Sequence, residues 1–368
     1  MSIKKIKYEQ LNDFLSSELI HHEFLHLDFI KNTIDQQGQS QLGSSFTNCI
    51  NLKSLEIDLE FNKINDLGLS AIVKPLYHCK NISNLELYIG SNNITAEGAL
   101  QLGNSLSKCD NLQTLIIQLA RNKIGVHGPS NLVSSLAECK NLLSLTVYLG
   151  SNSIGQQGAI DLGIALSRCK QIQTLFLQLS NNKIGDAGCQ GLCSQIQSCQ
   201  NLRKLTLNLQ QNNIGNQGIS FAGNIFSTCS NLSTIKLNMD KNNIGDQGIQ
   251  ELGNQIQNCK SLQILELSIY SNNVGDLGSE CLGTALSYCP KLIGIKIDLE
   301  SNDINNQGIF RLVAAISKNQ NLSTIILCLG GNKIDPQSEK QLLKLTLKMT
   351  NLIKLILYFT EEKSCNTC

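Results

Sequence analysis

The sequence lacks an excess of charge of either sign, and it lacks any long run of apolar residues. Lys and Arg number 30 and Asp and Glu number 29, so the net charge of +1 does not attract the chain to nucleic acid or to a membrane surface. No apolar run approaches the length that crosses a bilayer, and residues 1–20 lack the uninterrupted apolar stretch of a signal peptide. We therefore expect a cytoplasmic protein with no nucleic-acid partner and no membrane partner.

The sequence also lacks the residue patterns that carry catalysis or bind metals. It has no Ser/His/Asp order, no phosphate-binding glycine loop and no paired carboxylates that stand out from the repeat described below. His22 and His26 have the spacing of two metal ligands on a helix, but the repeat places Leu25 to Phe29 in a strand. The CNTC sequence at Cys365 to Cys368 lacks the second ligand pair of a zinc site. We therefore predict no catalytic residue, no metal site and no cofactor.

What the chain does contain is a repeat of 30 residues, which two columns of residues define. The cysteine column continues as Asn319 and Met349 and comprises Cys49, Cys79, Cys109, Cys139, Cys169, Cys199, Cys229, Cys259 and Cys289. The asparagine column comprises Asn32, Asn62, Asn92, Asn122, Asn152, Asn182, Asn212, Asn242, Asn272, Asn302 and Asn332. Such repetition is typical of a solenoid whose units stack around one continuous core.

Each repeat has the pattern of a strand, a turn and a helix. Leu115 to Leu119 is apolar at alternate positions, as expected for a strand with one buried face. Residues 97–109 (EGALQLGNSLSKC) follow the i, i+3, i+4, i+7 pattern of a helix. At the turn between strand and helix, the asparagine side chain can replace missing backbone partners and bond to neighbouring repeats. The asparagine column therefore indicates structure and not chemistry.

The cysteine and glycine columns also have structural explanations. Each cysteine ends a helix just before the strand enters the core, where a small apolar group packs well, so we expect buried thiols. Five glycines precede helices and suit a positive φ: Gly125, Gly155, Gly185, Gly215 and Gly245. Others lie within helices, where glycine costs about 1 kcal/mol relative to alanine, so we expect close approach of helix to sheet at Gly43, Gly103, Gly163, Gly223, Gly253 and Gly283.

These repeats resemble the leucine-rich repeat, in particular the ribonuclease-inhibitor-like class with a full helix in each unit. The unit IQTLFLQLSNNKIGDAG carries the framework residues Ile172, Leu175, Leu177, Leu179, Asn182 and Ile184. Repeat starts such as CKNLLSL are similar to those of leucine-rich-repeat proteins of ciliated protozoa. The expected fold is an α/β right-handed solenoid, or horseshoe, with a parallel β-sheet on the concave face and helices on the convex face. We expect a helical cap at residues 1–18, repeats over 19–360 and a tail at 361–368.

The strand positions that face away from the core vary between repeats, and they indicate a binding surface. On the concave face, Asp28 and four further acids precede a group of apolar and aromatic residues on consecutive strands. The predicted partner-binding residues are Glu56, Asp58, Glu60, Glu86, Tyr88, Ile116, Tyr148 and Phe176. Such a cluster with a charged flank is typical of an interface hot spot. The alternative is that a large sheet tolerates a few exposed apolar side chains.

The sequence thus predicts a non-catalytic scaffold that binds a protein partner of unknown identity on its concave face. One alternative is a regulator of an enzyme, such as a GTPase-activating protein of the leucine-rich-repeat type. Another is a structural component of a ciliary or cytoskeletal assembly. A further partner contact is expected at the C-terminal strand, where Leu355, Leu357 and Phe359 face the core while the outer strand edge lacks a partner.

Overall fold

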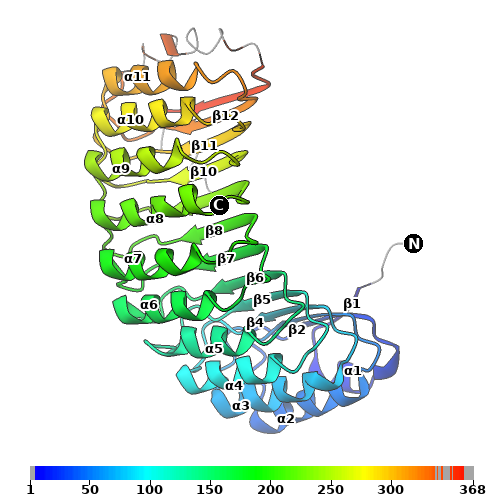
Figure 1. Cartoon of the computed structure of the whole chain (residues 1–368). Coiled ribbons are helices and arrows are strands. Elements are labelled where there is room, and N and C mark those ends of the chain that lie inside the picture. Colours follow the sequence, from blue (N-terminus) through cyan, green and yellow to red (C-terminus); the bar gives the residue numbers. More distant parts are fainter. Residues whose placement is uncertain (1–4, 336–337, 339–340, 343–348, 350, 360–368) are drawn as a thin grey trace. The chain divides into compact units, whose positions relative to one another are not determined.

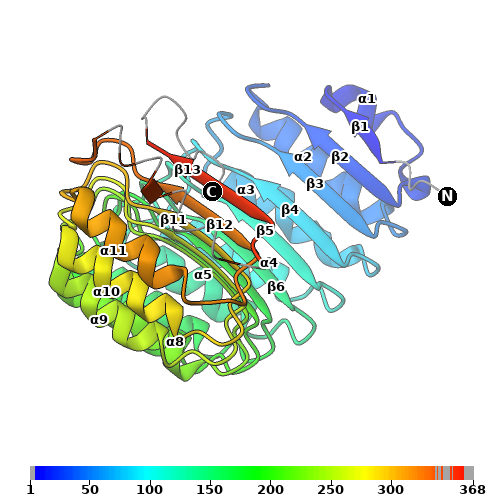
Figure 2. The ribbon, with the colours of Figure 1, turned by 90° about the horizontal axis from the view of Figure 1, so that it is seen from above.

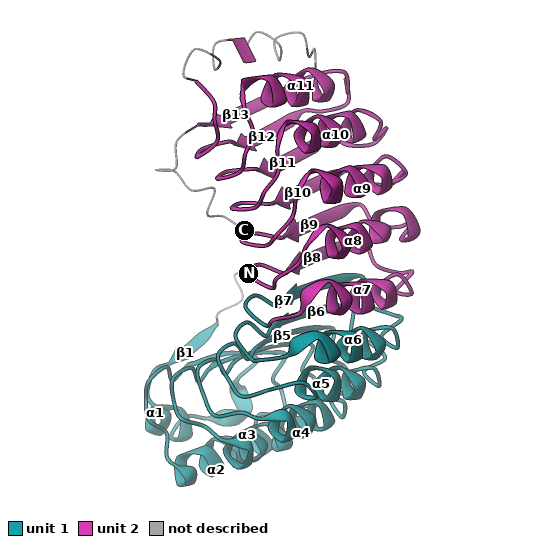
Figure 3. Ribbon diagram, turned by 90° about the vertical axis from the view of Figure 1, so that its left-hand side faces the viewer, with its two compact units in different colours: residues 1–182 teal, residues 183–368 magenta. Residues whose placement is uncertain are grey.

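Strands and helices alternate along the chain in the computed structural model, which describes residues 5–335, 338, 341–342, 349 and 351–359 (Figure 1). The chain divides into two compact units, unit 1 (residues 1–182) and unit 2 (residues 183–368). In each unit, helices cover one face of a parallel β-sheet, as Figures 2 and 3 show. The face opposite these helices is called the open face below. It corresponds to the face that the sequence predicts to be concave.

The strands of each unit follow one another in chain order and pair in parallel. Unit 1 contains β1 (Ile6–Tyr8), β2 (Phe24–Asp28), β3 (Ser54–Asp58), β4 (Asn84–Tyr88), β5 (Thr114–Gln118), β6 (Ser144–Tyr148) and β7 (Thr174–Gln178). Unit 2 contains β8 (Lys204–Asn208), β9 (Thr234–Asn238), β10 (Ile264–Ser268), β11 (Gly294–Asp298), β12 (Thr324–Cys328) and β13 (Lys354–Tyr358). Leu85 pairs with Leu55 on one side and Leu115 on the other, so the register advances by one full repeat per strand.

The helices of unit 1 are α1 (Leu11–Leu15), α2 (Gln36–Ser45), α3 (Asp66–Val73), α4 (Ala96–Leu106), α5 (Gly128–Leu136) and α6 (Gly155–Leu166). Short 3-10 helices are η1 (Leu19–His21), η2 (Phe46–Asn48) and η3 (Lys74–His78). Unit 2 contains α7 (Gly185–Ile196), α8 (Asn216–Thr228), α9 (Asp246–Ile256), α10 (Asp276–Ser287) and α11 (Asn306–Ile316). The core lies between sheet and helices, where Leu102 of α4 and Leu115 of β5 are fully buried. The predicted α/β solenoid is confirmed.

The asparagine column forms the ladder of side-chain hydrogen bonds that the sequence predicts. Asn92 illustrates it: Oδ1 accepts from the backbone N of Asn62 (3.1 Å) and Ile64 (2.8 Å), and Nδ2 donates to the carbonyl oxygens of Leu59 (2.9 Å), Ile89 (3.1 Å) and Gly90 (3.1 Å). One side chain therefore satisfies backbone groups of its own turn and of the preceding repeat. Because these groups are buried, the ladder fixes the stacking of the repeats.

A second asparagine ladder, which the sequence analysis does not identify, runs through the start of the repeat. Asn81 Nδ2 donates to the carbonyl oxygen of Ile50 at 3.0 Å, 31 residues earlier in the chain. The same bond recurs from Asn51, Asn111, Asn141, Asn231, Asn321 and Asn351. The Asn-Leu and Asn-Ile pairs that recur at the start of the repeats were the pattern in the sequence that could have indicated this ladder. These asparagines therefore have a structural role as well.

The glycines before the helices adopt two different conformations. Gly125, Gly155 and Gly185 have φ between +62° and +68°, as predicted. The prediction is wrong for Gly215 and Gly245, where φ is −110° and −118°. At Gly125 the backbone N–H donates forward, to the carbonyl of Asn152 (3.0 Å). At Gly215 and Gly245 it donates backward, to Oδ1 of Asp186 (2.6 Å) and Asn216 (2.7 Å) in the preceding repeat, and this contact holds the backbone extended.

The glycines within helices permit close packing of one helix against the next. A Cβ on Gly43 would lie 2.0 Å from the carbonyl oxygen of Ala71 in α3. On Gly103 or Gly283 it would lie 2.7 Å from a carbonyl oxygen of α5 or α11. The predicted compensation, an approach of helix to sheet, is therefore wrong. The neighbouring helix is the close contact, because the helices must stack at the short spacing that the repeats impose.

The cysteine column is buried, as predicted, with side chains that are at most 4% exposed. Burial raises the pKa of Cys49 to about 11 and that of Cys79 to about 12, so these side chains are thiols and not thiolates at neutral pH. The role goes beyond apolar packing, because Cys79 Sγ contacts the carbonyl oxygen of Phe46 at 3.3 Å. Asn319, which replaces cysteine in this column, donates to the equivalent carbonyl of Leu286 at 3.0 Å. Cys365 and Cys368 lie outside the described residues.

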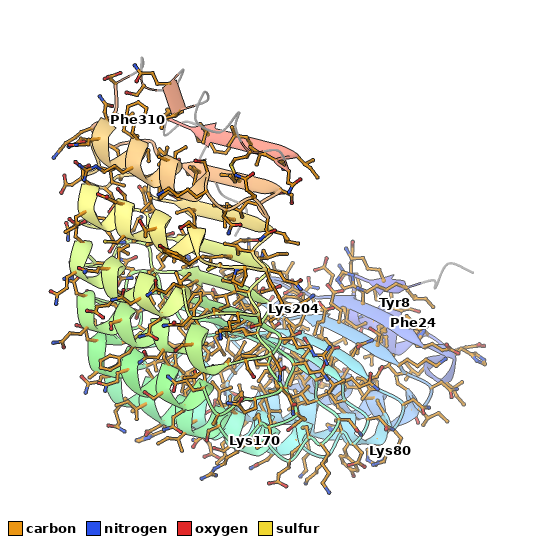
Figure 4. All side chains as sticks on the ribbon, turned by 45° about the horizontal axis from the view of Figure 1, so that its top comes forward. Tyr8, Phe24, Lys80, Lys170, Lys204 and Phe310 are labelled. Carbon is orange, nitrogen blue, oxygen red and sulfur yellow. The ribbon has the colours of Figure 1, made fainter. Side chains whose placement is uncertain are left out.

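An aromatic cluster closes the N-terminal end of unit 1. The ring of His22 lies 5.6 Å from that of Tyr8, which Figure 4 labels, and 6.2 Å from that of Phe14. Ser17 Oγ donates to the carbonyl of Phe14 (2.6 Å), so in its 2.8 Å contact with His22 it accepts from Nε2. His22 is 4% exposed, and its Nδ1 has no hydrogen-bond partner among the described residues. The cluster therefore holds a neutral histidine with Nδ1 unprotonated.

Acidification should destabilise this cluster. Burial lowers the pKa of His22 below its ordinary value of 6.5, with a smaller contribution from His21; the Tyr8 hydroxyl, 3.5 Å from Nε2, is the other titratable group that faces the ring. A lowered folded pKa means that the unfolded chain binds more protons, so stability is lost as the pH falls below 6.5. Glutamine at this position keeps a donor toward Ser17 but does not titrate. Thermal unfolding should therefore depend less on pH in His22→Gln than in wild type, and equal dependence would contradict the assignment.

The C-terminal strand β13 pairs with β12 on one side, and no strand lies beyond it in the described part of the chain. Leu355, Leu357 and Phe359 are only half-buried, whereas Ile325 and Leu327 in β12 are 1% exposed. Residues 360–368, which include the predicted tail, lie outside the described residues. The predicted contact of a partner with this edge thus stays a prediction.

Candidate functional site

The open face of unit 1 carries all the partner-binding residues that the sequence predicts. Strands β2, β3 and β5 to β7 share an alternation of half-buried and buried residues, and the half-buried ones point to the open face. Strand pairing aligns them in rows across the sheet. Glu56, Glu86, Ile116 and Phe176 share one row, while Asp58, Tyr88 and Tyr148 share the next. Thr146 lies between Ile116 and Phe176, so the four apolar residues do not form an uninterrupted row.

The aromatic residues of the site do not form one continuous cluster. The rings of Tyr148 and Phe176 are in contact, with centroids 5.0 Å apart and planes inclined by 43°. Tyr88 lies two strands away from Tyr148, and its hydroxyl donates to Glu86 Oε2 at 2.7 Å. Burial and this hydrogen bond raise the pKa of Tyr88, and burial raises the pKa of Tyr148. Both phenols are therefore neutral hydrogen-bond donors at physiological pH.

Two carboxylates on this face are already paired with lysines of β1 and its flank. Lys7 Nζ lies 2.9 Å from Asp28 Oδ2 and 2.7 Å from Glu9 Oε1. Lys5 forms an ion pair with Glu56, whose other oxygen lies 3.4 Å from His26 Nε2. The hydrogen bond from Lys7 lowers the pKa of Asp28. Lys5 and Lys7 lie outside the repeat and were not predicted as part of the site, although their alternation in KIK indicates two side chains on one face of a strand.

The carboxylates of Asp58, Glu60 and Glu86 form no ion pair with any described residue. Asp58 Oδ1 accepts only the backbone N–H of Glu60, at 2.9 Å. Burial raises the pKa of Asp58 and that of Glu60, and in Glu60 the charge of Asp58 adds to the effect. The Glu60 carboxylate lies over Gly90 of the next repeat, where a Cβ would come within 2.4 Å of Oε1. Negative charge therefore extends from β3 toward β4 without a cationic partner.

On the open face of unit 2, two carboxylates, those of Glu266 and Asp240, have side-chain partners. Lys236 Nζ lies 2.9 Å from Glu266 Oε1. Asp240 accepts from Ser268 Oγ (2.6 Å), the backbone N of Tyr270 (2.9 Å) and Asn238 Nδ2 (2.9 Å). Burial raises the pKa of Asp298 to about 6, and its Oδ1 accepts the backbone N–H of Glu300 at 3.0 Å. Asp298 therefore resembles Asp58 of unit 1, whereas Glu266 and Asp240 have side-chain partners.

The two histidines with metal-ligand spacing face different surroundings. His26 lies on β2 and approaches Glu56, whereas His22 is buried against Ser17. Within the part of the chain that the structure describes, no group of three or more His, Cys, Asp or Glu side chains is arranged to hold a metal ion. No helix among the described residues is long and apolar enough to span a bilayer. The expectations of no catalytic residue and no cofactor stay predictions.

Comparison with known proteins identifies part of the repeat array. A sequence profile of the family described as "Leucine Rich repeat" matches residues 48–73, 175–193, 199–221 and 231–253. These segments lie in both units and include β3, α3, most of β7, β8, β9 and the starts of α7, α8 and α9. Among curated proteins, no match was found. The chain thus contains leucine-rich repeats, a repeat type that generally serves as a protein-interaction module.

Proposed function

We propose that this array of leucine-rich repeats is a non-catalytic cytoplasmic scaffold that binds a partner protein on the open face of unit 1. The observation that carries the proposal is the contact between the Tyr148 and Phe176 rings on a sheet face that none of the described helices of unit 1 covers. Ile116, Tyr88 and the acids Glu56, Asp58, Glu60 and Glu86 complete the proposed surface. An aromatic anchor with a charged flank provides both affinity and orientation in protein interfaces.

The finer classification is part of the same proposal. A full helix in most repeats supports the ribonuclease-inhibitor-like class, since α6 and α7 each span 12 residues. The repeat starts support a similarity to ciliate proteins and hence a role in a ciliary or cytoskeletal assembly. The second candidate function is regulation of an enzyme, as in GTPase-activating proteins built from such repeats. Stimulation of GTP hydrolysis across a panel of small GTPases separates this candidate from the scaffold.

Removing the aromatic anchor should weaken capture of the partner at any salt concentration. Phe176→Ala deletes a half-buried ring from the sheet surface, so the fold should persist while the interface loses an anchor that typically contributes about 2 kcal/mol or more. This corresponds to about a 30-fold loss of affinity. Affinity purification from the native cell with quantitative mass spectrometry identifies proteins that wild type retains and the variant loses. Circular dichroism checks folding.

The matched control for this experiment is Lys108→Glu, an exposed position just beyond α4 and away from the open face. It should retain the full partner set. A candidate partner should then protect the backbone amides of β4 to β7 from hydrogen exchange in the purified complex. If Phe176→Ala retains every partner that wild type binds and Lys108→Glu loses them, the helix side carries the interface and the proposal is wrong.

A second contact of the proposed partner, or of another protein, is at the edge of β13. The strand leaves its outer backbone groups without a neighbouring strand in the described part of the chain, and Leu355, Ile356 and Leu357 are half-buried. Edges of this kind tend to be covered or to pair with another chain. This contact would be independent of the open face of unit 1, and Phe176→Ala should leave it intact.

A further inference from the structure

The open face of unit 1 shows which chemistry its partner would present. We propose that the surface from β3 to β7 docks an extended basic segment of the partner, whose lysine or arginine side chains pair with Asp58, Glu60 and Glu86. Apolar residues of the same segment would lie on Ile116, Tyr148 and Phe176. This inference rests on the proposed function, because it specifies the occupant of the same surface.

The charges of the open face of unit 1 favour a basic occupant. Five carboxylates lie on the open face over β2 to β4, and only Asp28 and Glu56 have a lysine partner. The charge of Arg121 lowers the pKa of Glu60, but Arg121 forms no ion pair with Glu60 in the described part of the chain. On the open face of unit 2, Glu266 has a lysine partner and Asp240 has hydroxyl and amide donors. In unit 1, the three carboxylates without an ion pair lie on the adjacent strands β3 and β4 or at the end of β3.

Strand β1 and its flank show how lysines of an extended segment pair with carboxylates of this face. Lys5 and Lys7 alternate along the chain, so both side chains point to the open face. Lys7 pairs with Asp28 on the adjacent strand, and Lys5 reaches Glu56 on the strand beyond it. Long flexible lysine stems thus bridge neighbouring strands of this sheet. A second segment lying over β3 and β4 could pair with the remaining carboxylates in the same way.

The carboxylates that lack an ion pair are unfavourable to bury in their ionised form. Burial without a cation raises the pKa of Asp58 and Glu60, whereas the lysine contact lowers the pKa of Asp28. A cation that docks beside Asp58 and Glu60 would favour their ionised forms and offset the cost of their burial. Binding should therefore weaken as the pH falls. This loss should begin at a pH above the ordinary carboxyl pKa values of 3.8 for aspartate and 4.5 for glutamate.

The probe is a fluorescent peptide of sequence IKKIKY, which copies residues 3–8 of the chain and has alternating lysines, with IEEIEY as the charge-reversed control. The full-length wild-type protein should bind IKKIKY, and more weakly at physiological than at low ionic strength. Asp58→Asn with Glu60→Gln should reduce the affinity about tenfold, because both ion pairs are lost while shape and the Glu60 N–H contact are kept. Anisotropy titrations measure both effects.

The matched control variant is Asp110→Asn with Glu138→Gln, which removes the same charge from two exposed positions outside the strands. It should bind IKKIKY as wild type does. Equal binding of IKKIKY and IEEIEY, or equal affinity of the Asp58/Glu60 variant and wild type, would overturn the inference. The Phe176→Ala capture experiment does not depend on these peptides, so the proposed open-face function could survive that outcome, and its own failure would be visible separately.

Discussion

Asn92→Ala is expected to lower the free energy of unfolding by about 3–5 kcal/mol, because one side chain serves five buried backbone groups. Its Oδ1 accepts from Asn62 and Ile64, and its Nδ2 donates to three carbonyl oxygens. Alanine supplies no partner to any of them. A buried polar group without a partner costs about 1–3 kcal/mol, and water that enters the truncated site recovers part of the total.

The neighbouring residue provides the control. Asn93 is exposed, and only its backbone N–H takes part in the described hydrogen bonds, at 2.9 Å from the Ile64 carbonyl. Asn93→Ala should change the free energy of unfolding by less than about 0.5 kcal/mol. Urea denaturation followed by circular dichroism compares the two variants. Similar urea midpoints for the two variants would show that the asparagine ladder is a result of repeat stacking and does not contribute to its stability.

The sequence was sufficient to predict the fold because each structural requirement recurs at a fixed interval. A single asparagine in a turn has many explanations, but asparagine at every thirtieth position requires a contact that recurs in every repeat. The same logic predicted the buried cysteines, although not their hydrogen bonds to the preceding helix, such as that of Cys79 to Phe46. Periodicity identifies a buried position, but it does not identify the atom that the side chain contacts.

The wrong predictions for the glycines before the helices concern one position of the repeat that adopts two different backbone conformations. Gly125 and Gly215 occupy the same position of the repeat, yet only Gly125 has a positive φ. The difference depends on Asp186 in the preceding repeat, which accepts the N–H of Gly215. At the corresponding position before Gly125 the residue is Ala96, which has no acceptor in its side chain. The conformation is therefore set by a residue 29 positions away, which a column-by-column comparison overlooks.

The candidate site could be predicted as a set of residues but not as an electrostatic surface. Alternation along strands places Glu56 and Asp58 on the open face. It does not show that β1 joins the same sheet and brings Lys5 to Glu56, because β1 has three residues and lies outside the regular repeat. The predicted acidic patch is thus partly neutralised at its N-terminal side. Its uncompensated part is displaced toward β3 and β4, next to the apolar group.

Gly43→Ala should destabilise unit 1 although alanine is the better helix former. The added Cβ would lie 2.0 Å from the carbonyl oxygen of Ala71 and 3.1 Å from the Cα of Ile72, both backbone atoms of α3 that cannot rotate away. Helix α2 or α3 must therefore shift, and overpacking of this kind costs about 1–3 kcal/mol and occasionally more. The gain in helix propensity is only about 1 kcal/mol. Because both contacts are with backbone atoms, we expect a cost at the upper end of this range and hence a net loss of about 2 kcal/mol in the free energy of unfolding.

Gly223→Ala is the matched substitution, because Gly223 occupies the same position of the repeat in unit 2. There the nearest atoms to a Cβ are Cγ and Cβ of Gln255, at 3.3 and 3.4 Å, and Cα of Leu252, at 3.4 Å. Only the Gln255 Cγ is closer than an ordinary contact, and this side chain can adjust. The helix-propensity gain then roughly balances the tighter contact, so stability should change by less than about 1 kcal/mol. Calorimetry of the two variants tests the difference. If Gly43→Ala is tolerated as well as Gly223→Ala, the neighbouring helices are not in limiting contact, and the glycine column needs another explanation.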